Sequence, residues 1–341
     1  MGTSADQSDP GVTVREMRPG DEAGILDLFR RVFAVDRTPA HWRWKFLDNP
    51  AGREVVVAVD RDGRIAGQFA SLPARGRVDG REAPISQLLD HMVDPALRRH
   101  GVYAAMARSF HERFVAPAPR GSWYGFNLEE IHRIQRDLYG MRPLSPVEAW
   151  TRPVGPVPVR PAGAGARLAD ALVGVERVRR CPAGTDALWE RARGRYRVAI
   201  DRDARHLDWR YANCPDVEYA LLAARHRATG RLLGLLVVRD GWAHESLVAI
   251  VDWVVPPSRW ANAAWRSLLD RADAIAREAR RPLLRAWLPP TSPDRDALAS
   301  RGFVAGPCPF LTSAWDDGNA ERPLDALRRG WHYTMGDTDI F

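Results

Sequence analysis

The chain has 341 residues, of which 45% are hydrophobic and 27% charged, and its formal net charge is +7. These proportions exclude a disordered or collagen-like protein, and no apolar run approaches the ~20 residues that cross a bilayer. At roughly 100–200 residues per domain, the length predicts two domains. The polar, acidic N-terminus lacks the features of a secretory signal, so we expect a cytoplasmic protein without a membrane partner.

The basic residues are almost entirely arginine. Lys45 is the only lysine among the 50, and the abundance of Ala, Gly and Pro points to a coding bias toward GC-rich codons. The arginines are scattered, often beside acidic residues as in 271–278, and form no stripe with interleaved aromatics, which argues against a nucleic-acid partner. The three cysteines have no metal-ligand spacing, so no metal site is expected.

Hydrophobic periodicity and turn residues predict the elements of the first half in chain order. Asn127-Leu-Glu-Glu130 has the pattern of a capping box that opens the last helix, and His132 on that helix is expected at the surface. The predicted elements are strand 12–17, helix 21–33, a short helix from Pro39, strands 55–59 and 65–72 around a tight turn, strand 85–93, helix 102–115, strand 123–126 and a helix that ends near Gly140.

Three similarities repeat between the halves of the chain. Residues 41–50 and 206–215 both follow His-x-x-Trp-basic-aromatic-x-x-x-Pro, at an offset of 165. Residues 90–95 and 252–257 share Asp-x-x-Val-x-Pro at an offset of 162, which also carries Gly140 onto Gly302. Their common order and spacing predict two copies of one fold.

The two copies are expected to be joined by a semi-rigid linker rich in Pro and Gly. We place the first domain at 1–151, the linker at 152–168 and the second domain, with its C-terminal tail, at 169–341. The aromatic and acidic tail 331–341 is expected to dock on its own domain, where it could line an acceptor site.

A turn between strand 85–93 and helix 102–115 carries the most informative motif. It reads Val-x-Pro-x-x-Arg-x-x-Gly over 93–101. A helix start provides unpaired amides and the positive end of the helix dipole, and glycine allows a diphosphate to approach the backbone. This motif and the predicted order of elements are similar to those of the GNAT superfamily of acyl-CoA-dependent N-acyltransferases. The Trp-Lys-Phe…Asn-Pro segment and the duplicated layout are similar to its bacterial tandem-domain members.

The resemblance implies an α/β (α+β) chain of two tandem GNAT-like domains, each a mixed sheet with splayed central strands flanked by helices. It implies acetyl-CoA or another acyl-CoA as co-substrate, bound by the first copy. The large Tyr103, where the family has Gly or Ala, is expected to point into the core. The second copy has Trp260 and Ala263 where the first has Arg98 and Gly101, so it is expected not to bind CoA. The cofactor-binding candidates are Met92, Val93, Arg98, Arg99, His100, Gly101, Val102 and Asn127.

The family reaction is direct attack of an amine on a thioester, which requires a strand amide for the oxyanion, a base and sometimes an acid. Asp90 and His91, on opposite faces of a strand, are the candidate bases, although Asp90 also suits a structural role because it recurs as Asp252. Glu129 could bind a cationic amine. Tyr139 is the candidate acid, with water as the alternative.

The leading hypothesis is an N-acyltransferase, acetyl by default, that acts on the primary amine of a small molecule. Two alternatives stay open: a tandem GNAT transferase that takes an aminoacyl group from tRNA, and a non-catalytic CoA-binding module. The Arg98-x-x-Gly101 turn counts against the first alternative. The sequence leaves the oligomeric state and the acceptor unspecified.

Overall fold

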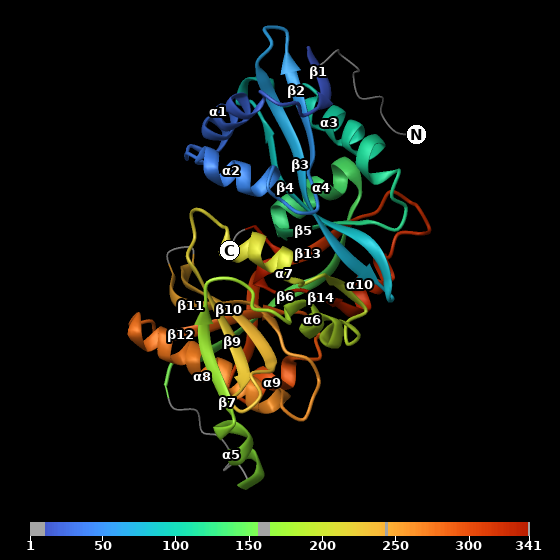
Figure 1. Ribbon diagram of the computed structural model, residues 1–341. Helices are drawn as coiled ribbons and strands as arrows, with labels where there is room; N and C mark the ends of the chain where they lie inside the picture. Colours follow the sequence, from blue (N-terminus) through green and yellow to red (C-terminus); the bar gives the residue numbers. More distant parts are fainter. Residues whose placement is uncertain (1–10, 156–163, 243–244, 340–341) are drawn as a thin grey trace. The chain divides into compact units, whose positions relative to one another are not determined.

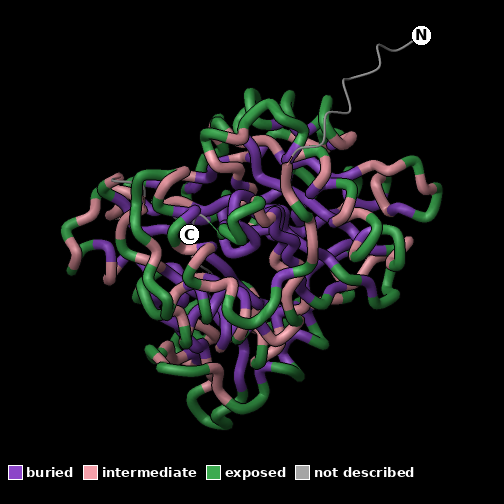
Figure 2. The backbone as a smooth tube through the Cα atoms, turned by 90° about the horizontal axis from the view of Figure 1, so that it is seen from above, coloured by how far each residue is buried: buried purple, intermediate pink, exposed green. Residues whose placement is uncertain are grey.

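The computed structural model describes residues 11–155, 164–242 and 245–339 (Figure 1). The chain forms two compact units whose segments alternate along the sequence. Within the described residues, unit 1 comprises 11–75, 83–143 and 313–324, and unit 2 comprises 76–82, 144–155, 164–242, 245–312 and 325–339. Figure 2 colours the backbone by how far each residue is buried.

Unit 1 has the elements that the sequence predicts, in the predicted order. Helix α1 buries Ile25, Leu28 and Phe29 on one face, and helix α2 begins at Pro39 after a Thr38 cap whose side chain accepts the His41 amide. The elements are β1 (Val12–Glu16), α1 (Glu22–Phe33), α2 (Pro39–Phe46), β2 (Glu54–Asp60), β3 (Ile65–Val78), β4 (Arg81–Val93), α3 (Val102–Phe110), β5 (Ser122–Leu128) and α4 (Glu129–Tyr139).

The sheet of unit 1 has the strand order β1-β2-β3-β4-β5, and its two faces are covered by different helices. Val55 and Val57 of β2 pack with α1 and α2, whereas Val56 of β2 packs with α3. Figure 1 shows these helices on opposite sides of the strands. Leu89 and Met92 of β4 both pack on the α1 and α2 side, although strict alternation would place them on opposite sides, so the alternation of β4 is interrupted between them.

Two local predictions about α4 are wrong. The helix has Leu128 at its N-cap with no side-chain cap, because β5 runs on through Leu128 and keeps Asn127 within the strand. There Asn127 Nδ2 donates to Ser313 Oγ at 2.8 Å. His132 is buried rather than exposed, since it lies on the inward face of the helix with Gln135.

Unit 2 repeats the strand order of unit 1, as β7-β9-β10-β11-β12. The helix caps are repeated as well. Asp203 caps α7 by accepting the His206 amide, as Thr38 does for α2. Its elements are β6 (Met141–Pro153), α5 (Ala164–Ala171), β7 (Val173–Val178), α6 (Thr185–Arg193), β8 (Val198–Ile200), α7 (Ala204–Leu207), β9 (Tyr219–His226), β10 (Leu232–Trp242), β11 (Glu245–Val254), α8 (Ala261–Glu278), β12 (Leu283–Leu288), α9 (Arg295–Ala299), β13 (Val304–Trp315), α10 (Leu324–Gly330) and β14 (Trp331–His332).

The central part of the expected linker, 156–163, lies outside the described residues. On either side of it, β6 ends at Pro153 and α5 begins at Ala164, so residues 164–168 are helical. The compact units divide β13, whose last residues, 313–315, belong to unit 1. The domain boundaries at 151 and 169 stay a prediction about the duplicated sequence.

Candidate active site

In unit 1 the two central strands separate halfway along their length. β4 and β5 pair in parallel only where Ile85–Gln87 faces Ser122–Tyr124. Beyond this point the ends of both strands, 88–93 and 125–128, have no pairing with each other. Backbone amides there are released from the ladder and can serve a ligand. This divergence is the splay of the central strands that the resemblance implies.

Helix α3 begins one short turn after the diverging end of β4. Gly101 is its N-cap with φ of +75°, and the Ala105 amide donates to the Gly101 carbonyl. The amides of the first helical residues, beginning with Val102, have no acceptor within the helix. Arg99 also has a positive φ, +69°, which sharpens the turn.

The side chains of this turn are open to solvent. Arg98, Arg99 and His100 are exposed, and neither arginine has an ion pair among the residues that the structure describes. The His100 ring hydrogen-bonds the Arg98 carbonyl at 2.9 Å. Unpaired guanidinium groups beside open helix amides can bind a diphosphate.

The other cofactor-binding candidates contribute differently. Met92 packs in the core beneath α1 and α2, and Val93 packs on the α3 side. The Met92 side chain is buried and that of Val93 is partly buried, so the backbone of β4 is what both residues most readily offer a ligand. Asn127 is buried on β5 and already bonded to Ser313.

His91 lies on the α3 side of β4 in an aromatic cluster. It stacks on Phe69 at 3.7 Å between ring centroids. Its Nε2 lies 3.2 Å from the Ala70 carbonyl and its Nδ1 lies 2.9 Å from the Tyr103 hydroxyl, so the geometry assigns Nε2–H as donor and Nδ1 as acceptor. Burial lowers the pKa of His91 to about 4. The imidazole is therefore neutral at pH 7, although its low pKa makes it a weaker base than a solvent-exposed histidine.

Tyr103 points into this cluster, as the sequence predicts for a large residue at the head of α3. Its ring stacks on Tyr139 from α4, with centroids 6.1 Å apart. Burial raises the pKa of Tyr139 well above its usual value, and the neighbouring Tyr103 raises it further. Tyr139 therefore stays protonated at neutral pH, as an acid must before it donates.

Asp90 lies on the opposite face of β4 and is held by two cations. Arg37 donates to both of its carboxylate oxygens, at 2.5 and 3.2 Å, and Lys45 Nζ lies 3.0 Å from Oδ2. Burial acts to raise the pKa of Asp90, but the charges of Lys45 and Arg37 outweigh it and hold that pKa well below its usual value. A carboxylate so stabilised is a weak base.

The remaining catalytic candidate lies apart from these groups. Glu129 is exposed on the first turn of α4 and has no hydrogen bond to Asp90, His91 or Tyr139 in the described ranges. Arg37 and Lys45 did not figure among the predicted site residues. The repeat offset of 165, which aligns Arg37 with Arg202, and the uniqueness of Lys45 were the signals that could have found them.

In unit 2 the corresponding strand region is occupied by the chain's own tail. β11 and β12 pair only over Leu247–Ile250 and Leu283–Ala286, and residues 335–337 contact both strands. Asp252, the counterpart of Asp90, binds Arg202 at 2.8 Å and accepts the hydroxyl of Thr334 at 3.1 Å. The expectation that the tail docks on its own domain is confirmed for 331–339; its last two residues, 340 and 341, lie outside the described residues.

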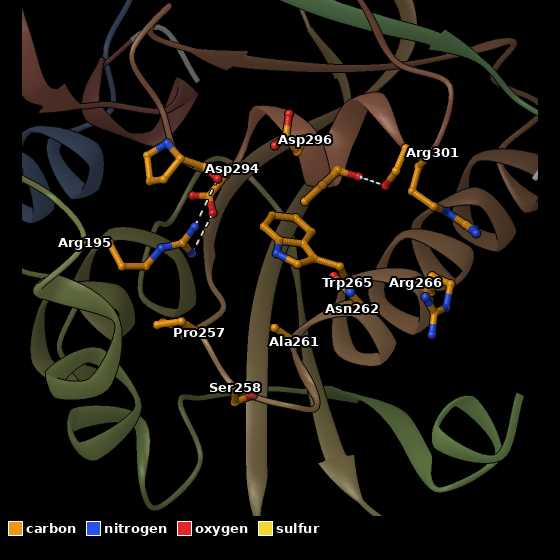
Figure 3. Close-up of a pocket in the computed structure, with 13 residues that line it drawn as sticks. Arg195, Pro257, Ser258, Ala261, Asn262, Trp265, Arg266, Asp294, Asp296 and Arg301 are labelled. Atoms are coloured by element: carbon orange, nitrogen blue, oxygen red, sulfur yellow. Dashed lines mark hydrogen bonds and ion pairs between the residues drawn. The ribbon is translucent and has the colours of Figure 1, made fainter. Parts of the chain in front are cut away.

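A pocket of about 560 Å³ lies at the head of α8, where unit 2 corresponds to the α3 turn (Figure 3). Three arginines line it, and each is paired with a carboxylate. The pairs are Arg195 with Asp294, Arg266 with Asp170, and Arg301 with Asp270. Paired guanidinium groups carry less attraction for phosphate than the unpaired Arg98 and Arg99 of unit 1.

The chain is similar to a known protein family and to several solved structures. Residues 13–118 match the family model of the acetyltransferase (GNAT) domain, which confirms the resemblance to the GNAT superfamily over this segment. A probable N-acyltransferase from Enterococcus faecalis has a TM-score of 0.64 at 14% identity, covering 89% of this chain and 71% of its own. A GCN5-related N-acetyltransferase from Anabaena variabilis has the same score and identity, with coverages of 89% and 72%.

Saccharomyces cerevisiae N-myristoyltransferase, solved with bound myristoyl-CoA, is also similar, with a TM-score of 0.57 at 11% identity and coverages of 89% and 78%. At these identities the likeness concerns the fold, and it fits the tandem GNAT-like architecture. No curated protein sequence matches the chain. The described part of the chain contains no cluster of metal-ligating side chains and no helix long and apolar enough to cross a membrane.

Proposed function

We propose that the protein is a CoA-dependent N-acyltransferase whose unit 1 binds the acyl-CoA and transfers the acyl group, acetyl by default, to the primary amine of a small molecule. One arrangement carries this proposal. The diverging end of β4 leads directly into a turn where open α3 amides adjoin the unpaired Arg98 and Arg99. The turn suits the CoA diphosphate, and the released strand amides suit the thioester carbonyl.

In the proposed reaction the amine nitrogen attacks the thioester carbon, the N–C bond forms and the C–S bond breaks. The amine loses a proton and the leaving thiolate gains one. Backbone amides of β4 at Met92 and Val93 would stabilise the oxyanion. His91 is the better placed base of the two on β4, because it is neutral whereas Asp90 is held by Arg37 and Lys45.

Two further roles complete the proposal. Tyr139, which stays protonated, would donate to the thiolate, with water as the alternative donor. Glu129, exposed on the first turn of α4, would attract a cationic amine from solvent. Asp90 would then act through the backbone that it holds rather than by taking a proton. A cytoplasmic location, and acyl-CoA binding by unit 1 rather than unit 2, remain part of this proposal.

The proposal predicts that acetyl-CoA raises the thermal midpoint of the wild-type protein and that the double variant Arg98→Ala, Arg99→Ala, which loses two such contacts, binds acetyl-CoA at least about 100-fold more weakly. The reason is that each charge-assisted hydrogen bond contributes about 1.5–3 kcal/mol. Calorimetric titration measures the affinity. Arg259→Ala, at the matching turn of unit 2, serves as the control and should leave the affinity unchanged.

The same titration separates the alternative functions. A wild-type response to aminoacyl-tRNA without any response to acetyl-CoA would favour the tRNA-dependent transferase. Binding of acetyl-CoA without transfer to any primary amine in a broad panel would favour a CoA-binding module. An Arg98, Arg99 double variant with full acetyl-CoA affinity would remove the proposed diphosphate site.

A further inference from the structure

Lys45 is a lysine in a chain whose other basic residues are all arginine. It is the only lysine among 50 basic residues, so arginine serves at every other cationic position. A lysine ammonium is compact and donates in any direction, whereas a guanidinium is planar and needs a matching fork of acceptors. The single lysine therefore marks a position where these properties matter.

The surroundings of Lys45 also suit a compact ammonium group. Its side chain is 2% exposed, within α2 between Trp44 and Phe46, and its Nζ lies 3.0 Å from Asp90 Oδ2. In unit 2 the matching residue of the repeat is Arg210, equally buried, whose guanidinium donates to the main-chain carbonyls of the tail. The fold therefore accommodates arginine at this place in the second copy.

Asp90 is the residue at which β4 leaves regular strand geometry. Its φ is +51°, a left-handed value that is uncommon outside glycine and that aspartate adopts more readily than most residues. Lys45 and Arg37 hold its carboxylate, and Gln68 Nε2 donates to its carbonyl at 3.0 Å. Three side chains thus fix one backbone unit within the diverging part of β4.

We propose that Lys45 is a positioning residue: through Asp90 it fixes the diverging backbone of β4 in the geometry that receives the acyl group. This inference rests on the proposed function of unit 1. It assigns the α3 turn to the CoA diphosphate and the region of Asp90, His91 and Met92 to the acyl carbonyl. Lys45 should therefore affect the binding of acetyl-CoA and leave the binding of CoA without an acyl group nearly unchanged.

A single lysine also makes a direct experiment possible. Protein labelled with ¹³C at the lysine ε-carbon gives one lysine side-chain NMR signal. We expect this signal to shift when acetyl-CoA is added and to shift less with CoA. An unshifted signal under saturation by acetyl-CoA would show that Lys45 is a structural residue only and would overturn the inference.

Variants test the same point by affinity. Lys45→Arg should weaken acetyl-CoA binding about tenfold, the equivalent of one hydrogen bond, and change CoA binding by less than about twofold. Arg210→Lys, the reverse exchange at the matching position of unit 2, should change neither affinity. Lys45→Met provides a second variant if Lys45→Arg does not fold.

The outcomes separate this inference from the proposed function. If the Lys45 variants bind acetyl-CoA and CoA equally more weakly, or bind both as tightly as the wild type, the positioning role is overturned. Unit 1 would still stand as the CoA-binding unit. Failure of the wild-type protein to bind either CoA species would overturn both proposals. Loss of acetyl-CoA binding alone, together with a shifted lysine signal, is the expected result.

Discussion

Replacing Arg202 by methionine is expected to lower the free energy of unfolding by about 3–5 kcal/mol, because it leaves two buried carboxylates without their cation. Arg202 is 1% exposed and donates to Asp252 at 2.8 Å and to Asp337 at 2.6 Å. Burial already raises the pKa of Asp337, so the loss of Arg202 would raise it further. Urea unfolding followed by circular dichroism measures the change.

Arg225→Met is the matched control for this substitution. Arg225 pairs with Glu176 at 2.7 Å, but its side chain is 31% exposed and that of Glu176 is 54% exposed, so its loss should cost less than about 1 kcal/mol. Equal effects of the two substitutions would mean that the tail is not anchored through Arg202. Because Asp337 lies in the tail, the Arg202 variant should also make residues 331–339 accessible to proteolysis.

Acidification from pH 6.5 to pH 4 is expected to destabilise the protein by several kcal/mol. Burial lowers the pKa of His91 and of His206 to about 4, and it lowers the pKa of His332 well below its usual value. These rings stay neutral in the folded protein, whereas in the unfolded chain they bind protons below about pH 6.5. Their contribution is therefore complete above that pH and is lost as the pH falls toward 4.

The size of this destabilisation follows from the pKa shifts of the buried histidines. A shift from 6.5 to about 4 corresponds to at most about 3 kcal/mol for each of His91 and His206. Unfolding free energies measured across this pH range give the slope. His332→Phe should reduce the slope without loss of stability at pH 7, since neither ring nitrogen of His332 has a partner among the residues described and the ring stacks on Tyr196.

A control and a contrary outcome define the histidine prediction. His226 is half-buried at a hairpin, outside the buried histidine sites, and His226→Gln serves as the control variant for the pH dependence. Stability that is flat between pH 6.5 and 4 would mean that the buried rings accept protons without unfolding.

The candidate site divides into parts that local sequence specifies and parts that it does not. The turn from β4 into α3 was predictable, because Pro95, Gly101 and the flanking arginines act on the backbone within a few residues. Alternation along β4 likewise placed Asp90 and His91 on opposite faces. The capping box at Asn127 failed because pairing between strands extended β5 past the point where a cap would form.

The sequence by itself determined the duplicated plan: the order of the elements, the absence of the Arg and Gly positions of the α3 turn from the second copy, and Tyr103 packing inward. These follow from periodicity and from side-chain size, which act over short stretches of chain. Only the tertiary structure decided which charges meet. Lys45 and Arg37 neutralise Asp90, and Asp337 of the tail reaches Arg202, across separations of 45 to 135 residues. Long-range pairings of this kind depend on how the chain folds back on itself, which no local pattern encodes.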